Sequence, residues 1–182
     1  MRIISGSHRG RRLVTPTNLP VRPTTDMAKE ALFNILVNRI DFEVTRVLDL
    51  FAGTGNLTFE FASRGCPEVT AVELNFKCIE FIKKTTGVLD FHTIRVMRAD
   101  AIQFIRHNRK NYELIFADPP YEMEGVDLIP GLIFENKLLS PNGLLILEHD
   151  EKVGFRQYPE FLETRNYGKV NFSFFEPKEL IS

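Results

Sequence analysis

The sequence has few of the features that mark secreted, membrane-bound or metal-binding proteins. Its longest purely aliphatic run, Leu144–Leu147, is far shorter than the roughly 20 residues that cross a bilayer. Its basic N-terminus continues with Gly, Ser, His and Arg, where a signal peptide would have an apolar stretch. Cys66 and Cys78 are too far apart for a CxxC pair, and the four histidines show no ligand spacing. We therefore expect a cytoplasmic protein with reduced thiols, no membrane segment and no metal site.

Length and charge indicate one domain with a small extension. The 182 residues are 43% hydrophobic and 26% charged, which is enough for a buried core and excludes wholesale disorder. Residues 1–25 contain five arginines and no acid, whereas residues 26–182 carry 18 basic and 24 acidic side chains. This asymmetry predicts a basic N-terminal arm, residues 1–25, on an acidic domain, residues 26–182. A nucleic-acid contact and a merely solvated terminus explain the charge of the arm equally well.

From residue 46 onward, short apolar segments alternate with helical ones. This alternation predicts an α/β fold with a mostly parallel sheet and helices on both of its faces. The expected strands lie near 46–51, 68–73, 93–98, 112–117 and 143–148, and the expected helices near 55–64, 75–87, 101–109 and 125–138. Two further strands, near 161–167 and 170–176, predict an antiparallel hairpin that turns at Gly168.

The N-terminal part of the chain has its own pattern. Residues 2–5 and 11–15 are strand-like, and prolines then mark a loop. A helix is expected to begin at Thr25 or Asp26, with its apolar face running from Ala28 to Ile40 and Lys29 on another face. We expect this helix to pack on the domain that follows.

A glycine turn follows the first expected strand, and an acid precedes the turn. Asp49 lies before Phe51-Ala52-Gly53-Thr54-Gly55-Asn56, where Gly53 and Gly55 allow a tight turn and close approach to a ligand. The third glycine of the dinucleotide fingerprint is missing, because Thr58 holds its position. A carboxylate repels a diphosphate and attracts a cation. S-Adenosylmethionine has a sulfonium, an ammonium and no phosphate, so it fits this turn better than a dinucleotide does.

Two more acids follow the second and third expected strands. Glu73 lies 24 residues after Asp49, near the offset of about 20 residues at which an acid binds ribose hydroxyls. An ordinary solvent-facing acid is the alternative. Asp100 can accept from an adenine amine while the N–H of Ala101 donates to the ring, and it can also cap a helix. Together these acids favour a ligand at the carboxyl ends of the strands.

The segment Asp118-Pro119-Pro120-Tyr121 follows the fourth expected strand. Its prolines stiffen the loop and remove N–H donors, so local carbonyls can face a ligand. Asp118 and the Pro119 carbonyl can accept both hydrogens of an exocyclic amine, and Tyr121 can stack on the base. A proline turn with a packed tyrosine is the alternative. Two fixed acceptors would orient the amine lone pair toward a methyl donor, and a paired base would have to be flipped out.

Five stretches of the chain together resemble the RsmD-type 16S ribosomal RNA guanine-N2 methyltransferases, a class I family that depends on S-adenosylmethionine. They are Met1-Arg-Ile-Ile-Ser-Gly6 with Arg9-Gly-Arg-Arg-Leu13, Arg22-Pro-Thr-Thr-Asp26, Glu30-Ala-Leu-Phe-Asn-Ile-Leu36, Val47-Leu-Asp-Leu-Phe-Ala-Gly-Thr-Gly55 and Asp118-Pro-Pro-Tyr121. The resemblance implies a Rossmann-like class I methyltransferase fold with a seven-stranded sheet.

The family resemblance also implies an activity and its residues. It implies methylation of a guanine N2 amine in 16S ribosomal RNA, within the 30S subunit or an assembly intermediate. The catalytic segment would be Asp118, Pro119, Pro120 and Tyr121. The cofactor residues would be Asp49, Phe51, Gly53, Gly55, Glu73, Asp100, Ala101 and Thr24, and the RNA contacts Arg9, Arg11, Arg12 and Arg22.

Departures from the family pattern and two rival functions remain. Met27 replaces a usual arginine, Asn56-Leu-Thr-Phe59 replaces a run of small residues, and Leu74 replaces a common lysine.

A DNA adenine-N6 methyltransferase can share the Asp-Pro-Pro-Tyr segment, but 182 residues leave no room for a recognition module. An inactive RNA-binding assembly factor would not need the intact Asp118 and glycine turn.

Overall fold

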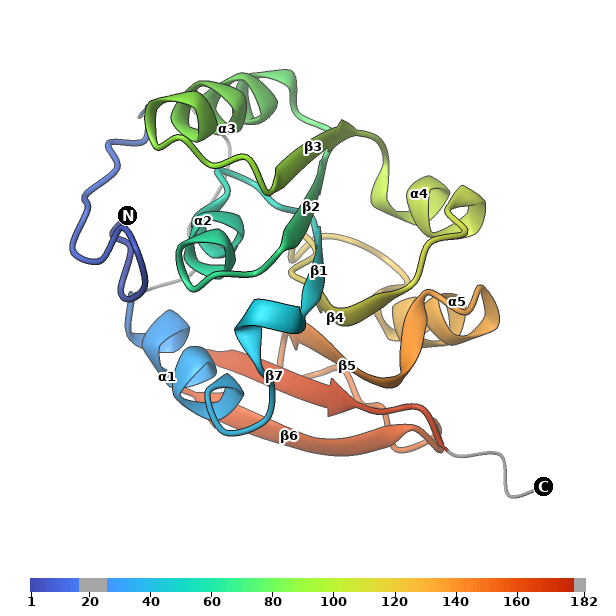
Figure 1. Ribbon diagram of the computed structural model, residues 1–182. Coiled ribbons are helices and arrows are strands. Elements are labelled where there is room, and N and C mark those ends of the chain that lie inside the picture. Colours follow the sequence, from blue (N-terminus) through green and yellow to red (C-terminus); the bar gives the residue numbers. More distant parts are fainter. Residues whose placement is uncertain (17–25, 179–182) are drawn as a thin grey trace.

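The computed structural model describes residues 1–16 and 26–178, and its centre is a seven-stranded sheet (Figure 1). The strand order is β3-β2-β1-β4-β5-β7-β6, with β1 to β5 parallel and β7 antiparallel to both of its neighbours. The strands are β1 (Arg46–Leu50), β2 (Glu68–Glu73), β3 (Ile94–Arg98), β4 (Tyr112–Ala117), β5 (Leu139–His149), β6 (Phe161–Tyr167) and β7 (Val170–Phe175). This confirms the expected mostly parallel sheet with an antiparallel hairpin at one edge.

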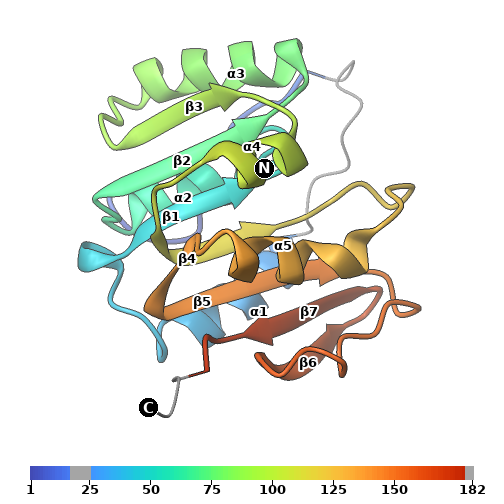
Figure 2. The ribbon, with the colours of Figure 1, turned by 90° about the vertical axis from the view of Figure 1, so that its right-hand side faces the viewer.

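Helices cover both faces of the sheet (Figure 2). One face carries α1 (Asp26–Leu36), α2 (Asn56–Ser63) and α3 (Phe76–Val88), and the other carries α4 (Ala101–His107) and α5 (Ile129–Glu135). Two short 3-10 helices, η1 (Phe42–Val44) and η2 (Val126–Leu128), lie in the connections. Within the part of the chain that the structure describes, no helix has the length and apolar character needed to cross a membrane.

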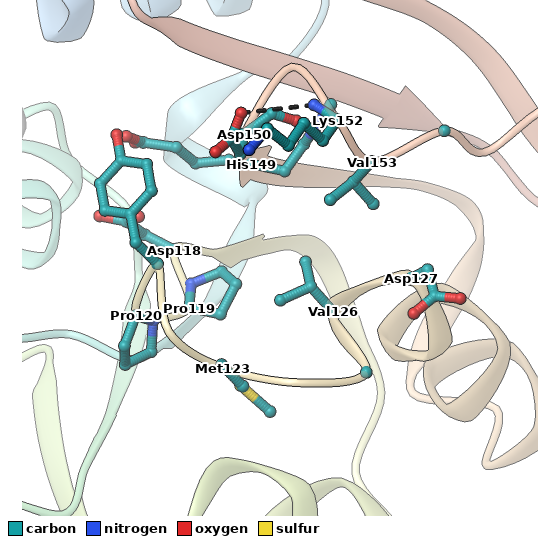
Figure 3. A pocket seen from close by; sticks show the side chains of 14 residues that line it. Asp118, Pro119, Pro120, Met123, Val126, Asp127, His149, Asp150, Lys152 and Val153 are labelled. Atoms are coloured by element: carbon teal, nitrogen blue, oxygen red, sulfur yellow. Dashed lines mark hydrogen bonds between the residues drawn. The ribbon is translucent and has the colours of Figure 1, made fainter.

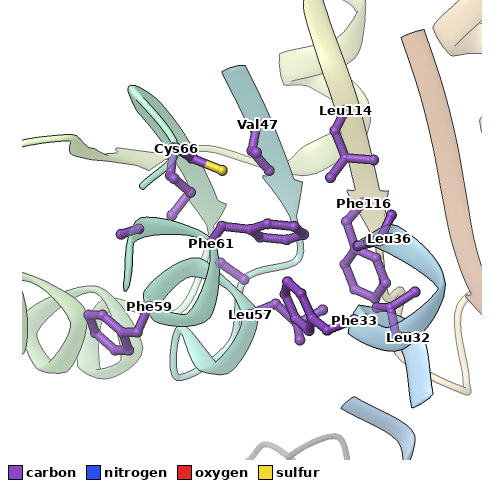
Figure 4. Close-up of a cluster of buried hydrophobic side chains, with 14 of the residues drawn as sticks. Leu32, Phe33, Leu36, Val47, Leu57, Phe59, Phe61, Cys66, Leu114 and Phe116 are labelled. Atoms are coloured by element: carbon purple, nitrogen blue, oxygen red, sulfur yellow. The ribbon is translucent and has the colours of Figure 1, made fainter. Parts of the chain in front are cut away.

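The core on the α1–α3 face is rich in phenylalanine (Figure 4). Phe33 of α1 meets Phe61 of α2 with ring centroids 4.9 Å apart, and both are buried above Val47, Leu114 and Phe116 of the central strands. Burying one such side chain contributes roughly 1.5–3 kcal/mol to folding. The apolar stripe of the first helix therefore packs on the sheet, as the sequence predicts.

Three elements differ from the sequence-based expectation. Strand β5 begins at Leu139 rather than near residue 143, because the Pro141–Gly143 stretch passes through a bulge opposite β4 instead of forming a turn. The expected helix 125–138 is divided into η2 and α5, since Pro130 lacks the N–H that a continuous helix would use. Residues 2–5 and 11–15 form no strands and share one isolated bridge, between Arg2 and Arg12.

The described N-terminal segment docks on α2. Ile3 is fully buried, and the carboxylate of Glu60 accepts the N–H groups of Ile4 and Ser5 at 2.7 and 3.0 Å. Gly6 lies so close to α2 that a Cβ atom there would be 1.7 Å from the Ser63 carbonyl oxygen. The first residues of the chain are thus part of the folded structure.

Lys29 links this segment to α1 and α2. Its Nζ donates to the Arg2 carbonyl at 2.6 Å and to Asn56 Oδ1 at 2.9 Å, and it lies 3.5 Å from Glu60. Burial lowers the pKa of Lys29, and the charge of Glu60 opposes that shift. The sequence placed Lys29 away from the apolar face, and the structure buries it because the docked segment and α2 together supply its acceptors.

Candidate active site

Two cavities lie along the carboxyl ends of the parallel strands. The larger has a volume of about 1000 Å³ and the smaller about 340 Å³. The residues that line both are Asp118, Pro119, Pro120, Tyr121, Met123 and Glu148. The loop after β4 and the end of β5 therefore stand between the two cavities, at the edge where parallel α/β sheets bind their ligands.

The larger cavity is strongly acidic. Six carboxylates line it, and Lys169 is the one cationic side chain among the described lining residues. The acids are Asp49, Glu73, Asp100, Asp118, Glu122 and Glu148. Such a wall repels phosphate groups and attracts a cationic ligand.

The glycine turn between β1 and α2 borders this cavity. Phe51 has φ 62°, a value that is unusual for a side chain of its size, and Gly53 and Gly55 have φ 54° and 78°. Gly53 lines the cavity, whereas Gly55 does not. A Cβ on Gly55 would lie 3.0 Å from Phe59 and 3.1 Å from Ile82, so this glycine allows α2 to pack closely.

Glu73 holds the glycine turn from the end of β2. One carboxylate oxygen accepts the N–H of Gly53 at 2.7 Å, and the other accepts the N–H groups of Leu74 and Asn75 at 2.9 and 2.7 Å. Glu73 also lines the cavity, so its oxygens can accept from a ligand in addition to fixing the loop.

Asp100 and Ala101 lie at the start of α4. Asp100 Oδ1 accepts the N–H of Gln103 at 2.9 Å, which is the helix cap that the sequence allows. Both Asp100 and Ala101 also line the larger cavity. The cap uses one oxygen of the Asp100 carboxylate, so the side chain has a second oxygen with which to accept from a ligand.

Asp49 is buried at the end of β1 and is held by Thr58. The Thr58 hydroxyl donates to Asp49 Oδ2. Burial raises the pKa of Asp49 to about 7, and the charges of Asp118 and Glu73 act in the same direction. The sequence analysis noted Thr58 only because it replaces a glycine of the dinucleotide fingerprint. Its hydroxyl, on the first turn of the helix that follows Asp49, could have indicated a hydrogen bond to that acid.

Glu148 is a buried acid that the sequence did not select as a site residue. Ala117 of β4 pairs with Leu147 of β5, so Asp118 and Glu148 follow at the same level on adjacent strands. Glu148 is 6% exposed, and its Oε2 has no hydrogen-bond partner among the described residues. Burial raises its pKa to about 7. The available signal was its place directly after the apolar run 144–147.

The smaller cavity lies between the Asp118–Tyr121 loop and the residues that follow β5 (Figure 3). His149 borders it, with one ring nitrogen 2.7 Å from Ser173 Oγ and the other 2.7 Å from the Asp150 carbonyl oxygen. Burial lowers the pKa of His149, which favours its neutral form. Tyr121 is 58% exposed, so its ring is accessible beside the cavity.

The remaining expected site residues are in the N-terminal region. Arg9, Arg11 and Arg12 are exposed on the docked segment. Thr24 and Arg22 lie outside the described residues. Residues 1–16 and 26–178 contain no group of three or more His, Cys, Asp or Glu side chains placed to hold a metal ion.

Comparisons with known proteins match almost the whole chain. The family model described as conserved hypothetical protein 95 matches residues 1–176. YlbH of Bacillus subtilis is 37% identical over 157 residues, which cover 84% of each chain. Ribosomal RNA small subunit methyltransferase D of Escherichia coli is 31% identical over 159 residues, 87% of this chain and 79% of that protein. The solved structure of yhhF from Escherichia coli has a TM-score of 0.84 at 27% identity, over 98% of this chain and 99% of that one.

Proposed function

The chain belongs to the family of ribosomal RNA small subunit methyltransferase D, and we propose that it methylates the exocyclic N2 amine of a guanine in 16S ribosomal RNA, with S-adenosylmethionine as donor. The observation that carries the proposal is the position of the Asp118–Tyr121 loop, which separates an acidic cavity from a second, smaller one. Methyl transfer needs this arrangement, with a donor on one side of the amine acceptors and a nucleobase on the other.

The larger cavity fits the donor by volume and charge. When bound, S-adenosylmethionine supplies a methyl group on a positively charged sulfur. Asp49 and the turn at Phe51 and Gly53 would hold its charged part, Glu73 its ribose, and Asp100 with Ala101 its adenine. The excess of carboxylates disfavours a phosphate-bearing cofactor in the same place. We also include Thr24 in the proposed site, because the family resemblance implies it.

The loop after β4 would hold the amine. Asp118 and the Pro119 carbonyl accept its two hydrogens, and the accessible ring of Tyr121 stacks on the base. Because Pro119 and Pro120 fix the loop, these acceptors need little reorganisation when the amine arrives. Their pull moves the nitrogen toward tetrahedral geometry and directs its lone pair toward the larger cavity. Orientation and electrostatics of this kind account for the rate.

Proton transfer follows the formation of the new bond. An aromatic amine is not acidic before it is methylated, so no strong base is required for the attack. Once nitrogen carries the methyl group, its extra proton passes to Asp118 or to water. The base must be unpaired or flipped out of a helix to reach the loop.

RNA would meet the protein at the exposed arginines 9, 11 and 12, which lie on the segment docked against α2. These side chains contribute positive charge beside an otherwise acidic domain. Arg22 is proposed as a further contact from the family resemblance. With a ribosomal RNA substrate, free or in the 30S subunit, the proposed activity would be cytoplasmic.

The test is transfer of tritium from labelled S-adenosylmethionine to 30S subunits, naked 16S RNA and DNA. We expect label in one guanine N2 of the RNA, located by mass mapping. Label in adenine of DNA would replace the proposal with the rival methyltransferase. Absence of transfer to all three would support an inactive binding protein instead.

The variant Asp118→Asn tests the loop itself. It keeps the shape of the side chain but replaces one acceptor oxygen with a donor, so we expect kcat to fall by about 100- to 1000-fold while donor affinity stays within about twofold. The matched control is Asp90→Asn, an exposed position with φ 53° that asparagine tolerates well. Unchanged kcat in Asp118→Asn would remove Asp118 from the mechanism.

A further inference from the structure

We propose that Glu148 selects guanine over adenine by accepting the N1–H of the base whose N2 amine is bound by Asp118 and Pro119. This inference rests on the proposed function and adds the residue that sets base identity.

Glu148 lies where a second contact to the same base is needed. Ala117 and Leu147 are paired in the parallel ladder, so Asp118 and Glu148 follow at the same level on adjacent strands. Neighbouring strands are about 4.8 Å apart. A carboxylate at the end of β5 can therefore reach the ring atom next to the amine that β4 holds. Glu148 lines both cavities, as the loop after β4 does.

The Oε2 atom of Glu148 has no donor within the described protein. The residue is 6% exposed, and the atom itself is buried without a hydrogen bond. Other buried acids of the protein have donors, since Asp49 at this edge accepts from Thr58, and Glu60 on α2 accepts from Ile4 and Ser5. Buried polar atoms in folded proteins are nearly always paired. An exception that borders a binding cavity indicates that the ligand supplies the donor.

Guanine supplies the required donors and adenine does not. Guanine presents N1–H beside its N2 amine, so two neighbouring carboxylates can accept from adjacent atoms. Adenine presents a bare N1 lone pair beside its amine, which a carboxylate oxygen repels. Burial raises the pKa of Glu148 to about 7, so the side chain is ionised at pH 8 and acts there as an acceptor only.

The experiment compares guanine with 2-aminopurine at the target nucleotide. 2-Aminopurine keeps the amine at C2 but has a lone pair at N1 in place of N1–H. The target is the guanosine that mass mapping identifies, and the analogue is placed there in 16S RNA by ligation before assembly into 30S subunits. Methyl transfer by wild type, Glu148→Gln and Glu148→Asp is measured at pH 8 as kcat and KM separately.

For wild type we expect kcat/KM to favour guanine by at least about tenfold. Glu148→Gln should lose at least about tenfold in kcat/KM on guanine, because a neutral amide oxygen accepts N1–H less strongly than a carboxylate does. It should lose less on 2-aminopurine, whose N1 can accept from the amide N–H. The guanine preference should therefore shrink by the ratio of these two losses. Glu148→Asp should retain the preference with lower activity.

The control is Glu151→Gln, the same chemical change at an exposed position that lines neither cavity. Melting temperature and the affinity for S-adenosylhomocysteine report on folding and on the donor site for each variant. A Glu148→Gln enzyme with lower activity but an unchanged guanine preference would show a merely structural role and overturn the inference. If wild type transfers no methyl group to guanine, the proposed function fails and this inference fails with it.

Discussion

The buried carboxyl group of Asp49 gives a prediction about stability that can be measured without substrate. Asp49 has a pKa of about 7 in the folded protein, compared with an ordinary value of 3.8, mainly because of burial. Between about pH 4 and pH 7 the unfolded chain therefore ionises at this residue while the folded protein keeps its proton. The resulting stabilisation is fully present below pH 4 and is lost as the pH rises through 7. The perturbation that isolates it is Asp49→Asn, whose amide does not ionise and still offers Thr58 an acceptor.

The size of the effect follows from the two pKa values. A separation of about three pH units corresponds to about 4 kcal/mol of unfolding free energy. Relative to wild type, Asp49→Asn should gain stability steadily from about pH 4 to pH 7 and then remain level, with a total gain of about 4 kcal/mol. Subtracting the wild-type curve removes the contributions of titrating groups that are distant from Asp49, which the two proteins share.

The assay is urea unfolding followed by circular dichroism at half-unit steps from pH 4 to pH 8.5, since the chain has no tryptophan to serve as a fluorescent probe. A parallel calorimetric titration of wild type with S-adenosylmethionine near pH 6 should show proton release, because a cationic ligand favours the ionised form of Asp49. If the difference between variant and wild type does not change with pH, the burial argument for Asp49 is wrong.

Three further predictions concern the N-terminal segment and its anchors. Lys29→Met should lower the unfolding free energy by about 3–5 kcal/mol, because it leaves Glu60 and two buried acceptors with fewer partners; Lys84→Met, at an exposed site on α3, should change it by less than about 0.5 kcal/mol. Gly6→Ala should cost at least twice as much as Gly10→Ala in urea unfolding. Both glycines have φ 82°, but only at Gly6 does a Cβ meet backbone; equal losses would show that the segment does not dock. Replacing arginines 9, 11 and 12 by alanine should reduce the slope of log Kd for RNA against log salt by about 2 in filter binding; an unaltered slope would exclude these arginines as phosphate contacts.

The sheet and most of the cavity wall were predictable because they depend on local patterns. Apolar runs specify strands that are covered on both faces, and the alternation with helices then fixes their parallel order. Since parallel strands end at one edge, acids that follow successive strands must gather there. Asp49, Glu73, Asp100 and Asp118 all line one cavity, as this rule requires. Gly55 shows the limit of the rule. It does not line the cavity, and its lack of a side chain allows α2 to pack closely.

What the sequence did not show depends on contacts between distant segments. Lys29 is a charged residue that periodicity places away from the apolar face, and its burial depends on contacts with α2 and with the docked residues 1–5. Thr58 gains its role from lying above Asp49 in space. Pro141 and Gly143 are typical of a turn, yet pairing with β4 carries them through as a bulge. In each case tertiary contacts outweighed a local preference.

The cluster of carboxylates also explains why donor and base sites belong together. Asp118 and Glu73 raise the pKa of Asp49, so each negative charge at this edge makes the next one more costly. Glu148, which lines both cavities, has a pKa of about 7 because burial disfavours its ionised form. Selection for stability alone would not favour buried acids at these positions. A cation in the larger cavity and hydrogen-bond donors in the smaller one would lower that cost at both ends of the cluster. Asp49 and Glu148 each have a pKa of about 7, so a cationic donor and a base with hydrogen-bond donors would both favour the ionised forms of these two acids.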